Sequence, residues 1–138
     1  MPSTPVLLDT CALIWLFNRS PLNEASRKAI AAAATDQRLL VSPFSAWEVG
    51  MLVRKGKIAL TMPPRTWFGK VAEHPAITLA ELTPEVLIES SFLPGEPPGD
   101  PADRIVVATG RANGATIVTR NRPILAYAAL GHAAALAC

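Results

Sequence analysis

Short apolar runs alternate with helix-length segments along this chain, and the alternation constrains the fold more than any other feature. Strands are predicted at residues 6–8, 39–41, 115–119 and 133–136, and residues 77–82 fit either a further strand or a connecting segment. Segments of roughly ten residues with helical patterning separate them. Strands that alternate with helices form parallel sheets with helices on both faces. The sequence therefore predicts an α/β protein.

The helices and their connections suggest one domain over residues 1–138. Helices are predicted over residues 10–17, 23–34, 43–55, 61–74, 83–92, 102–113 and 122–130. The segment LPGEPPG, residues 93–99, is dense in Pro and Gly and is the one clear loop. With 138 residues, 50% of them hydrophobic, the chain has the size of one domain and ample material for a core.

Charge and cysteine content narrow the class of protein. Charged residues make up 17% of the chain, below the roughly 25% that is typical, so each acid in an apolar context is informative. The net charge of +2 is compatible with an anionic partner. Cys11 and Cys138 form no CxxC pair, and we expect Cys11 to be a buried free thiol in a reducing, cytoplasmic compartment. The sequence shows neither a signal-peptide pattern nor an apolar run of the ~18 residues that a membrane span needs.

Asp9 interrupts the apolar stretch PVLLDTCALIWLF at the predicted junction between a strand and a helix. Open α/β folds place their ligands at this carboxyl edge of a parallel sheet. An Asp at such a junction also commonly caps the helix by accepting a backbone N–H, and for Asp9 taken alone capping is the commoner role. The next residue, Thr10, supplies a hydroxyl beside the acid.

Glu48 is the sharpest signal in the sequence. On a helix over residues 43–55 its neighbours include Met51 and Leu52, so its carboxylate lies on or beside the apolar stripe. It falls in the second turn and therefore cannot be a cap. A carboxylate withdrawn from water costs several kcal/mol unless a cation or hydrogen-bond donors compensate it. The structural alternative is a salt bridge to an arginine such as Arg104.

Two further acids and an amide occupy predicted helix starts. Asp100 precedes Pro101 and is a good N-cap, which is its favoured role. Asp103 lies where the following helix turns its apolar positions inward, and we expect a carboxylate that faces a pocket there. Asn121 follows a predicted strand, where it either caps the next helix or lends a hydrogen bond to a site.

These acids together predict a metal site. If Asp9, Glu48 and Asp103 meet at one sheet edge, burial and mutual repulsion raise their pKa values unless positive charge is supplied. Oxygen ligands with no His or Cys nearby select Mg²⁺ or Mn²⁺ over zinc, and Mg²⁺ binds through a few carboxylates plus substrate phosphates. His74 and His132 pair with no nucleophile in the sequence, and no glycine-rich phosphate loop occurs. Metal-assisted phosphodiester hydrolysis is the chemistry that this set favours.

Three segments in order, LLDTCALIWL, SPFSAWEVGMLVRKGKI and DPADRIVVATGRANGATIVTRNRPI, cover essentially the whole chain and resemble the PIN-domain ribonucleases. Within that family they resemble the VapC-type toxins of type II toxin–antitoxin systems. The resemblance implies an α/β/α sandwich with a central parallel sheet of about five strands, and Mg²⁺- or Mn²⁺-dependent endonucleolytic cleavage of RNA. It also implies a cytoplasmic homodimer, neutralised by a VapB-like antitoxin whose C-terminal segment enters the acidic site, often with an Arg.

The same resemblance assigns roles to individual residues. Catalytic and metal-binding roles fall on three acids: Asp9, Glu48 and Asp103. Thr10 and Asp100 are expected to support them. The family usually has an Asp where this chain has Asn121, so one formal negative charge is missing. That difference would weaken metal binding, favour one ion over two, or reduce activity.

Basic and aromatic residues are candidates for RNA contacts. The basic candidates for phosphate contacts are Arg120, Arg122, Lys55 and Lys57, for which an ordinary solvated surface is an equal alternative. Trp67 and Phe68 either stack a base of single-stranded RNA or, as we favour, bury a helix or dimer contact.

Three other functions stay open. A catalytically weakened PIN-like module, with Asn121 in place of an acid, would bind RNA or its antitoxin without cleaving. A phosphate-transferring α/β domain would use Asp9 as a nucleophile, but it predicts an acid two residues on, where Cys11 stands. In a structural module the acids would only be helix caps, and the position of Glu48 argues against that.

Overall fold

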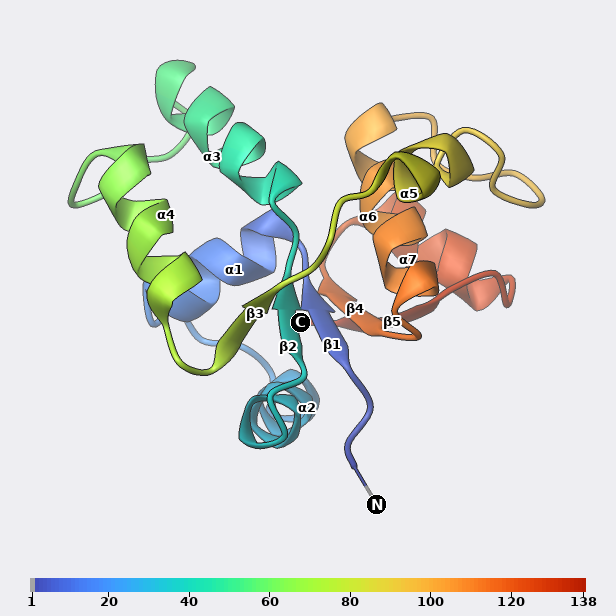
Figure 1. Ribbon diagram of the computed structural model, residues 1–138, viewed down its shortest axis with the longest axis horizontal. Coiled ribbons are helices and arrows are strands. Elements are labelled where there is room, and N and C mark those ends of the chain that lie inside the picture. The colour runs from blue at the N-terminus through green and yellow to red at the C-terminus, as the bar shows by residue number, and fades with distance from the viewer. Residues whose placement is uncertain (1) are drawn as a thin grey trace.

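A five-stranded, wholly parallel sheet forms the centre of the molecule in the computed structural model, which describes residues 2–138 (Figure 1). The strands are β1 (Val6–Leu8), β2 (Leu39–Val41), β3 (Ile77–Leu79), β4 (Thr116–Thr119) and β5 (Ala134–Ala137). Their order across the sheet is β3-β2-β1-β4-β5. The α/β prediction is confirmed, and residues 77–82 contribute the edge strand β3.

The order of the strands fixes where a ligand site can form. Strand β1 is central, and Leu7 pairs with Leu40 of β2 on one side and with Ile117 of β4 on the other. The chain runs outward from β1 to β3 and then returns to the opposite side of β1. Ligands of open α/β sheets bind where the strand order reverses, beyond the carboxyl ends of the strands. Here that point lies between β1 and β4.

Seven helices cover the two faces of this sheet (Figure 1). They are α1 (Thr10–Phe17), α2 (Glu24–Thr35), α3 (Phe44–Arg54), α4 (Pro64–Glu73), α5 (Pro84–Glu89), α6 (Pro101–Ala112) and α7 (Arg122–Ala129). Helices α1 to α4 pack on one face, and helices α5 to α7 pack on the other. The predicted α/β/α layers are therefore confirmed.

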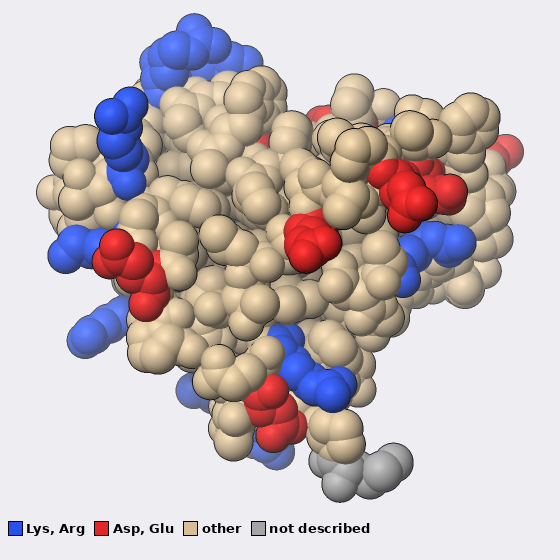
Figure 2. All heavy atoms as spheres, viewed as in Figure 1, with Lys and Arg blue, Asp and Glu red and all other residues tan. Residues whose placement is uncertain are grey.

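Charged side chains are unevenly distributed over the surface (Figure 2). Lys and Arg gather over the end of α3 and the connection to α4, at the upper left of the view, and Asp and Glu gather over α5 and the segment that leads to it. Further acids lie over the end of α4 and beside α2 on the same face.

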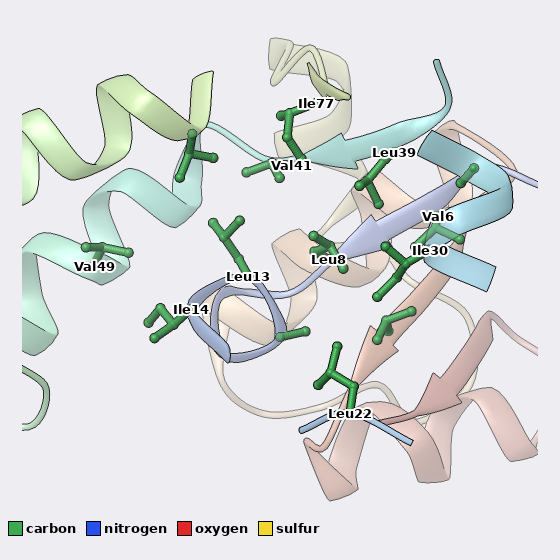
Figure 3. Packing of buried hydrophobic residues seen from close by; sticks show 14 of the residues in the cluster. Val6, Leu8, Leu13, Ile14, Leu22, Ile30, Leu39, Val41, Val49 and Ile77 are labelled. Atoms are coloured by element: carbon green, nitrogen blue, oxygen red, sulfur yellow. The ribbon is translucent and has the colours of Figure 1, made fainter. Parts of the chain in front are cut away.

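Successive side chains of β1 point to opposite faces of the sheet, so the strand contributes to the core on both faces. Val6 and Leu8 contact the cluster formed with α1 to α4, part of which Figure 3 shows, and Leu7 contacts the cluster formed with α5 to α7. Each buried Leu or Val stabilises the fold by roughly 1.5–3 kcal/mol. Truncating Leu7 to Ala leaves a cavity between the sheet and the second layer, and such truncations cost about 2–5 kcal/mol. This rigid sheet holds the loops that follow β1, β2 and β4.

Two predictions about individual side chains are corrected by the structure. Cys11 is a free thiol, but it is exposed, not buried, because it lies at the mouth of a cavity beyond the sheet edge. Trp67 is buried and meets Phe17 edge to face at 6.1 Å between ring centroids, while Phe68 packs against the same core. Base stacking by Trp67 and Phe68 is therefore wrong, and their packing role is confirmed. Among the described residues no helix is both long and apolar enough to cross a membrane.

Candidate active site

Asp9 lies directly after β1 and caps α1. Its Oδ1 accepts a hydrogen bond from the backbone N–H of Ala12 at 2.7 Å, and its Oδ2 accepts one from the hydroxyl of Thr119, at the end of β4. Asp9 as a whole is 8% exposed. The expected cap is present, yet a carboxylate has about four lone-pair sites, so two hydrogen bonds leave room for another ligand.

Glu48 projects from the second turn of α3 toward α1. Thr10 donates its hydroxyl to Glu48 Oε1 at 2.7 Å, and the same hydroxyl oxygen lies 2.9 Å from Ser45 Oγ. Thr10 and Ser45 are both buried. These polar contacts between the first turn of α1 and the first two turns of α3 fix the Glu48 side chain beside the apolar core, as its place in the sequence predicted.

Asp103 and Asn121 meet across α6 and α7. Asn121 caps α7, since its Oδ1 accepts from the N–H of Ile124 at 3.0 Å, and its Nδ2 donates to Asp103 Oδ1 at 3.1 Å. Both roles that the sequence left open for Asn121 are therefore present. Asp100 caps α6 by accepting from the N–H of Ala102 at 2.8 Å, as expected.

The three predicted acids face one cavity of about 250 Å³ beyond the carboxyl ends of β1 and β4. Its lining residues are Asp9, Thr10, Cys11, Trp15, Glu48, Asp103, Val106, Arg120, Asn121 and Ile124. Asp100 and Arg122 were also predicted as site residues, and neither lines this cavity. Residues far apart in the sequence thus converge at the point where the strand order reverses.

No salt bridge to the acids of the cavity is found among the residues that the structure describes. Burial raises the pKa of Asp9, Glu48 and Asp103 above the ordinary values, and repulsion among the acids adds to the rise for Glu48 and Asp103. Among residues 2–138 the one salt bridge is the exposed pair of Lys28 with Glu24. The structural alternative of a pair between Glu48 and Arg104 is wrong.

Arg104 is engaged elsewhere, because its Nε donates to the backbone oxygen of Pro98 at 2.6 Å. Arg120 is the arginine of the cavity. Its guanidinium lies 3.9 Å from the centroid of the Trp15 ring, and its Nε donates to the backbone oxygen of Cys138 at 2.6 Å. These two contacts hold a cation at the rim of the acidic cavity.

The donor set fits a hard divalent cation. The carboxylates of Asp9, Glu48 and Asp103 offer oxygen ligands, which Mg²⁺ and Mn²⁺ prefer. No group of three or more His, Cys, Asp or Glu side chains that could hold an ion unaided is found among residues 2–138. Mg²⁺ usually keeps several waters and is bound by one or two carboxylates plus substrate phosphates. Three acids that line one cavity and form no salt bridge among the described residues suit that mode of binding.

The sequence did not identify four lining residues: Cys11, Trp15, Val106 and Ile124. Cys11 is exposed as a residue, but its thiol is partly withdrawn from water at the rim of the cavity. This partial desolvation, followed by repulsion from Asp9 and Glu48, raises the pKa of the thiol to about 11, so the thiol is protonated at neutral pH and is a poor metal ligand. Trp15 lies in the helix that Asp9 caps, and this nearness in the sequence was the available signal that Trp15 could lie beside the acid. Its partner Arg120 comes from a distant strand end, which the sequence could not pair with it.

Comparison with known proteins identifies the class. The PIN domain family matches residues 6–130. Ribonuclease VapC22 of Mycobacterium tuberculosis is 34% identical over 125 residues, which cover 90% of this chain and 92% of that protein. The chain therefore belongs to the PIN-domain family and is related to its VapC ribonucleases, as the sequence motifs implied.

A solved structure shares the fold. A chain in the crystal structure of VapBC2 from Rickettsia felis, bound to a DNA fragment from their promoter, superposes with a TM-score of 0.67. The match covers 96% of this chain and 97% of that chain, at 14% sequence identity. At that identity the likeness concerns the fold alone.

Proposed function

We propose that this protein is an endoribonuclease toxin that hydrolyses RNA phosphodiester bonds with the help of Mg²⁺ or Mn²⁺. The observation that carries the proposal is the cavity of Asp9, Glu48 and Asp103, whose carboxylates are partly or wholly buried and lie beside no ion-pairing cation. Such a site is stabilised by a divalent ion. The similarity to Ribonuclease VapC22 supplies the substrate class.

Each residue of the cavity has a distinct role in this proposal. Asp9, Glu48 and Asp103 would hold the ion, Thr10 orients Glu48 through its 2.7 Å hydrogen bond, and Asn121 orients Asp103. When bound, a divalent ion offsets the phosphate charge and makes an attacking water more acidic. The neutral Asn121 supplies a hydrogen bond where an acid would repel Asp103.

Arg120 binds the phosphate in this proposal. Its Nε is already occupied by Cys138 and its face by Trp15, so its remaining guanidinium N–H groups are held in position at the rim. Arg–phosphate contacts use several N–H donors at once, and holding the side chain in place beforehand reduces the entropy lost on binding. Arg122 and Asp100 act from outside the cavity, Arg122 on the RNA backbone and Asp100 on the local charge.

The partner that we propose is a VapB-like antitoxin, with the toxin acting as a cytoplasmic homodimer. The acidic cavity lacks an ion-paired cation, so an arginine of a partner peptide would be attracted to it. The Rickettsia felis structure is of a VapBC assembly, in keeping with such a partner. The alternative, a module that binds without cleaving, is not favoured, because a protein that is 34% identical over 125 residues is a ribonuclease, VapC22.

Incubation of the purified chain with single-stranded RNA, with Mn²⁺ or with EDTA, tests the proposal. We expect cleavage with Mn²⁺ and none with EDTA, restored when Mn²⁺ is added in excess. The Glu48→Gln variant, purified in the same way, controls for contaminating nucleases and should not cleave. Cleavage that persists in EDTA or in the variant would refute the assignment, as would intact RNA under every metal condition.

A further inference from the structure

Ser45 is a buried serine of α3 to which the proposed chemistry gives no role. It is 1% exposed, and its hydroxyl oxygen lies 2.9 Å from the hydroxyl oxygen of Thr10. Within residues 2–138 this is the one hydrogen-bond contact that the Ser45 hydroxyl makes. A hydroxyl withdrawn from water needs a hydrogen-bond partner, so the Ser45 hydroxyl depends on Thr10.

The hydroxyl of Thr10 lies between two other oxygen atoms. Its Oγ1 is 2.9 Å from Ser45 Oγ and 2.7 Å from Glu48 Oε1. A hydroxyl has one proton to donate and two lone pairs that accept, whereas an ionised carboxylate only accepts. The proton of Thr10 therefore goes to the Glu48 carboxylate, and the proton in the remaining contact comes from Ser45.

The burial of Ser45 favours this direction of the hydrogen bonds. If Thr10 donated to Ser45 instead, the proton of Ser45 would have no acceptor among the described residues. A buried polar hydrogen without an acceptor is costly. The hydrogen bonds therefore run from Ser45 through Thr10 to Glu48. The second carboxylate oxygen of Glu48, Oε2, accepts no hydrogen bond within residues 2–138 and is left for a cation.

A second threonine, beside the same cavity, is arranged in a similar way. Thr119 donates its hydroxyl to Asp9 Oδ2, and its oxygen accepts the backbone N–H of Asn121 at 2.9 Å. A backbone N–H can only donate, so it directs the proton of Thr119 to the acid. Two acids of the cavity thus each accept from a threonine whose oxygen already accepts from another donor. For Glu48 that other donor is Ser45.

The packing of α1 against α3 holds the two hydroxyls together. Leu13 lies one turn after Thr10, Val49 lies one turn after Ser45, and both are fully buried in one core cluster (Figure 3). Side chains in such a close-packed core keep their rotamers. The contact between the hydroxyls is therefore fixed by the packing of two helices and not by either helix alone.

We propose that Ser45 is a positioning residue of the metal site, whose hydroxyl donates to Thr10 and thereby directs the proton of Thr10 to Glu48. The proposal rests on the proposed function, because its effect is on the divalent ion that Glu48 would help to hold. Side chains behind the metal ligands orient those ligands, and their loss commonly lowers metal affinity about 10- to 100-fold. Without the Ser45 hydroxyl, Thr10 is free to turn away and Glu48 loses its fixed donor.

Mn²⁺ binding to Ser45→Ala, measured by calorimetry without RNA, tests the proposal. We expect the Kd for Mn²⁺ to rise about 10-fold, at the lower end of the usual range because Ser45 acts through Thr10. Ser42→Ala is the matched control. Ser42 is 2% exposed and lies just before the same helix, but its hydroxyl contacts only the backbone N–H of Phe44. This variant also loses a buried hydroxyl, yet it should bind Mn²⁺ like the wild type.

A double-mutant cycle shows whether Ser45 acts through Thr10. Thr10→Val removes the hydroxyl at nearly constant shape, and we expect it to raise the Kd for Mn²⁺ at least as much as Ser45→Ala does. In the Thr10→Val background Ser45→Ala should have no further effect, because the link to Glu48 is already broken. Thr10→Ser, which keeps the hydroxyl, should recover most of the affinity. Effects of Thr10→Val and Ser45→Ala that simply add in the double variant would overturn the proposal.

The remaining outcomes separate the positioning role from the proposed function. If Ser45→Ala binds Mn²⁺ and cleaves RNA like the wild type, Ser45 is a packing residue only, and the ribonuclease stands. If Ser45→Ala is too unstable to titrate, Ser45→Cys takes its place, since it keeps a side chain of similar size with a weaker donor. A raised Kd then supports the proposal, and an unchanged Kd overturns it. If the wild type neither binds Mn²⁺ nor cleaves RNA, the function fails and the positioning role fails with it.

Discussion

The two ends of the sheet each carry a cavity, and they differ in chemistry more than in size. The cavity at the carboxyl edge measures about 250 Å³ and is lined by Asp9, Glu48 and Asp103. The other measures about 390 Å³ and lies near the amino ends of β2 and β3, since Leu39 and Ile77 line it. None of the described residues that line this larger cavity is an acid.

The difference shows that the direction of the strands and the charge of the lining residues decide where the candidate active site lies. The volume of the cavity does not decide it. At the carboxyl edge the chain leaves each strand into a helix start, where Asp9 and Asn121 cap with side-chain oxygens. At the amino edge the apolar side chains of helix ends and strand starts meet, as Phe17 and Ile77 do. Polar groups with raised pKa values therefore gather at one end alone, and such groups mark functional sites.

The largest effect that we expect is loss of cleavage when the acidic cavity loses one charge. Asp9→Asn keeps the helix cap, since Asn caps as well as Asp, but removes an anionic ligand. We expect kcat/KM for RNA to fall by at least about 100-fold, as for removal of other groups that stabilise transition-state charge. Glu81→Gln, at an exposed acid that does not line the cavity, serves as the control and should leave cleavage unchanged. Cleavage by Asp9→Asn within twofold of wild type, measured on the same RNA, would remove Asp9 from the site.

The next effect concerns pH and metal. The pKa of Asp9, Glu48 and Asp103 is raised in the folded chain above unfolded values of 3.8, 4.5 and 3.8. The folded state therefore binds protons more tightly than the unfolded chain does. The stability that the protonated acids contribute is present below pH 4, and it is lost as the pH rises through their raised pKa values. In EDTA, Tm should decrease as the pH rises above pH 4. This decrease should be smaller in Asp9→Asn, which has one titrating acid fewer in the cavity.

Mn²⁺ should reverse the loss at neutral pH. Saturation at about 100 times Kd stabilises a folded protein by about 2.7 kcal/mol. The measurement is thermal unfolding in EDTA and in Mn²⁺ between pH 4 and pH 8. A Tm that rises with pH in EDTA, or an equal response of Asp9→Asn to Mn²⁺, would contradict this account.

A smaller effect is expected from restoring the acid that the family usually has. Asn121→Asp keeps the cap on α7 but replaces the donor to Asp103, 3.1 Å away, with a second negative charge. We expect tighter Mn²⁺ binding and, in EDTA, a loss of about 1 kcal/mol in the free energy of unfolding from like-charge repulsion. Asn121→Ala, which loses the cap as well, should lose about 1 kcal/mol without tighter binding. Mn²⁺ titrations by calorimetry compare the three chains, and equal affinities would show that Asn121 lies outside the metal site.

The smallest effect is expected at the amino edge. Ala34→Leu fills part of the apolar cavity, and such changes alter the free energy of unfolding by about 1 kcal/mol in either direction. Cleavage should stay within about twofold of wild type, because this cavity contains no acid and lies across the sheet from the site. A large loss of kcat with unchanged Tm would mean that both ends of the sheet serve the function.

Much of the fold was predictable because its signals are local. The short apolar strands, the caps at Asp9, Asp100 and Asn121, and the loop at residues 93–99 each depend on neighbours within a few positions. Glu48 was also predictable, since a carboxylate beside an apolar stripe needs a reason to be there. Parallel strands and helix caps place such side chains at one edge of the sheet whatever the remaining packing is.

Contacts between distant segments were decided by the tertiary structure alone. The sequence left base stacking open for Trp67 and favoured packing, and only the structure shows that Trp67 packs against Phe17 in the core while Trp47 remains exposed. It offered Arg104 as the partner of Glu48, yet that position is taken by Thr10, and Arg104 bonds to a backbone oxygen. Helical periodicity determines which residues share a face. Which face is covered, and which charge meets which, depends on how α1, α3 and α4 pack against one another, and that packing is not encoded in any single segment.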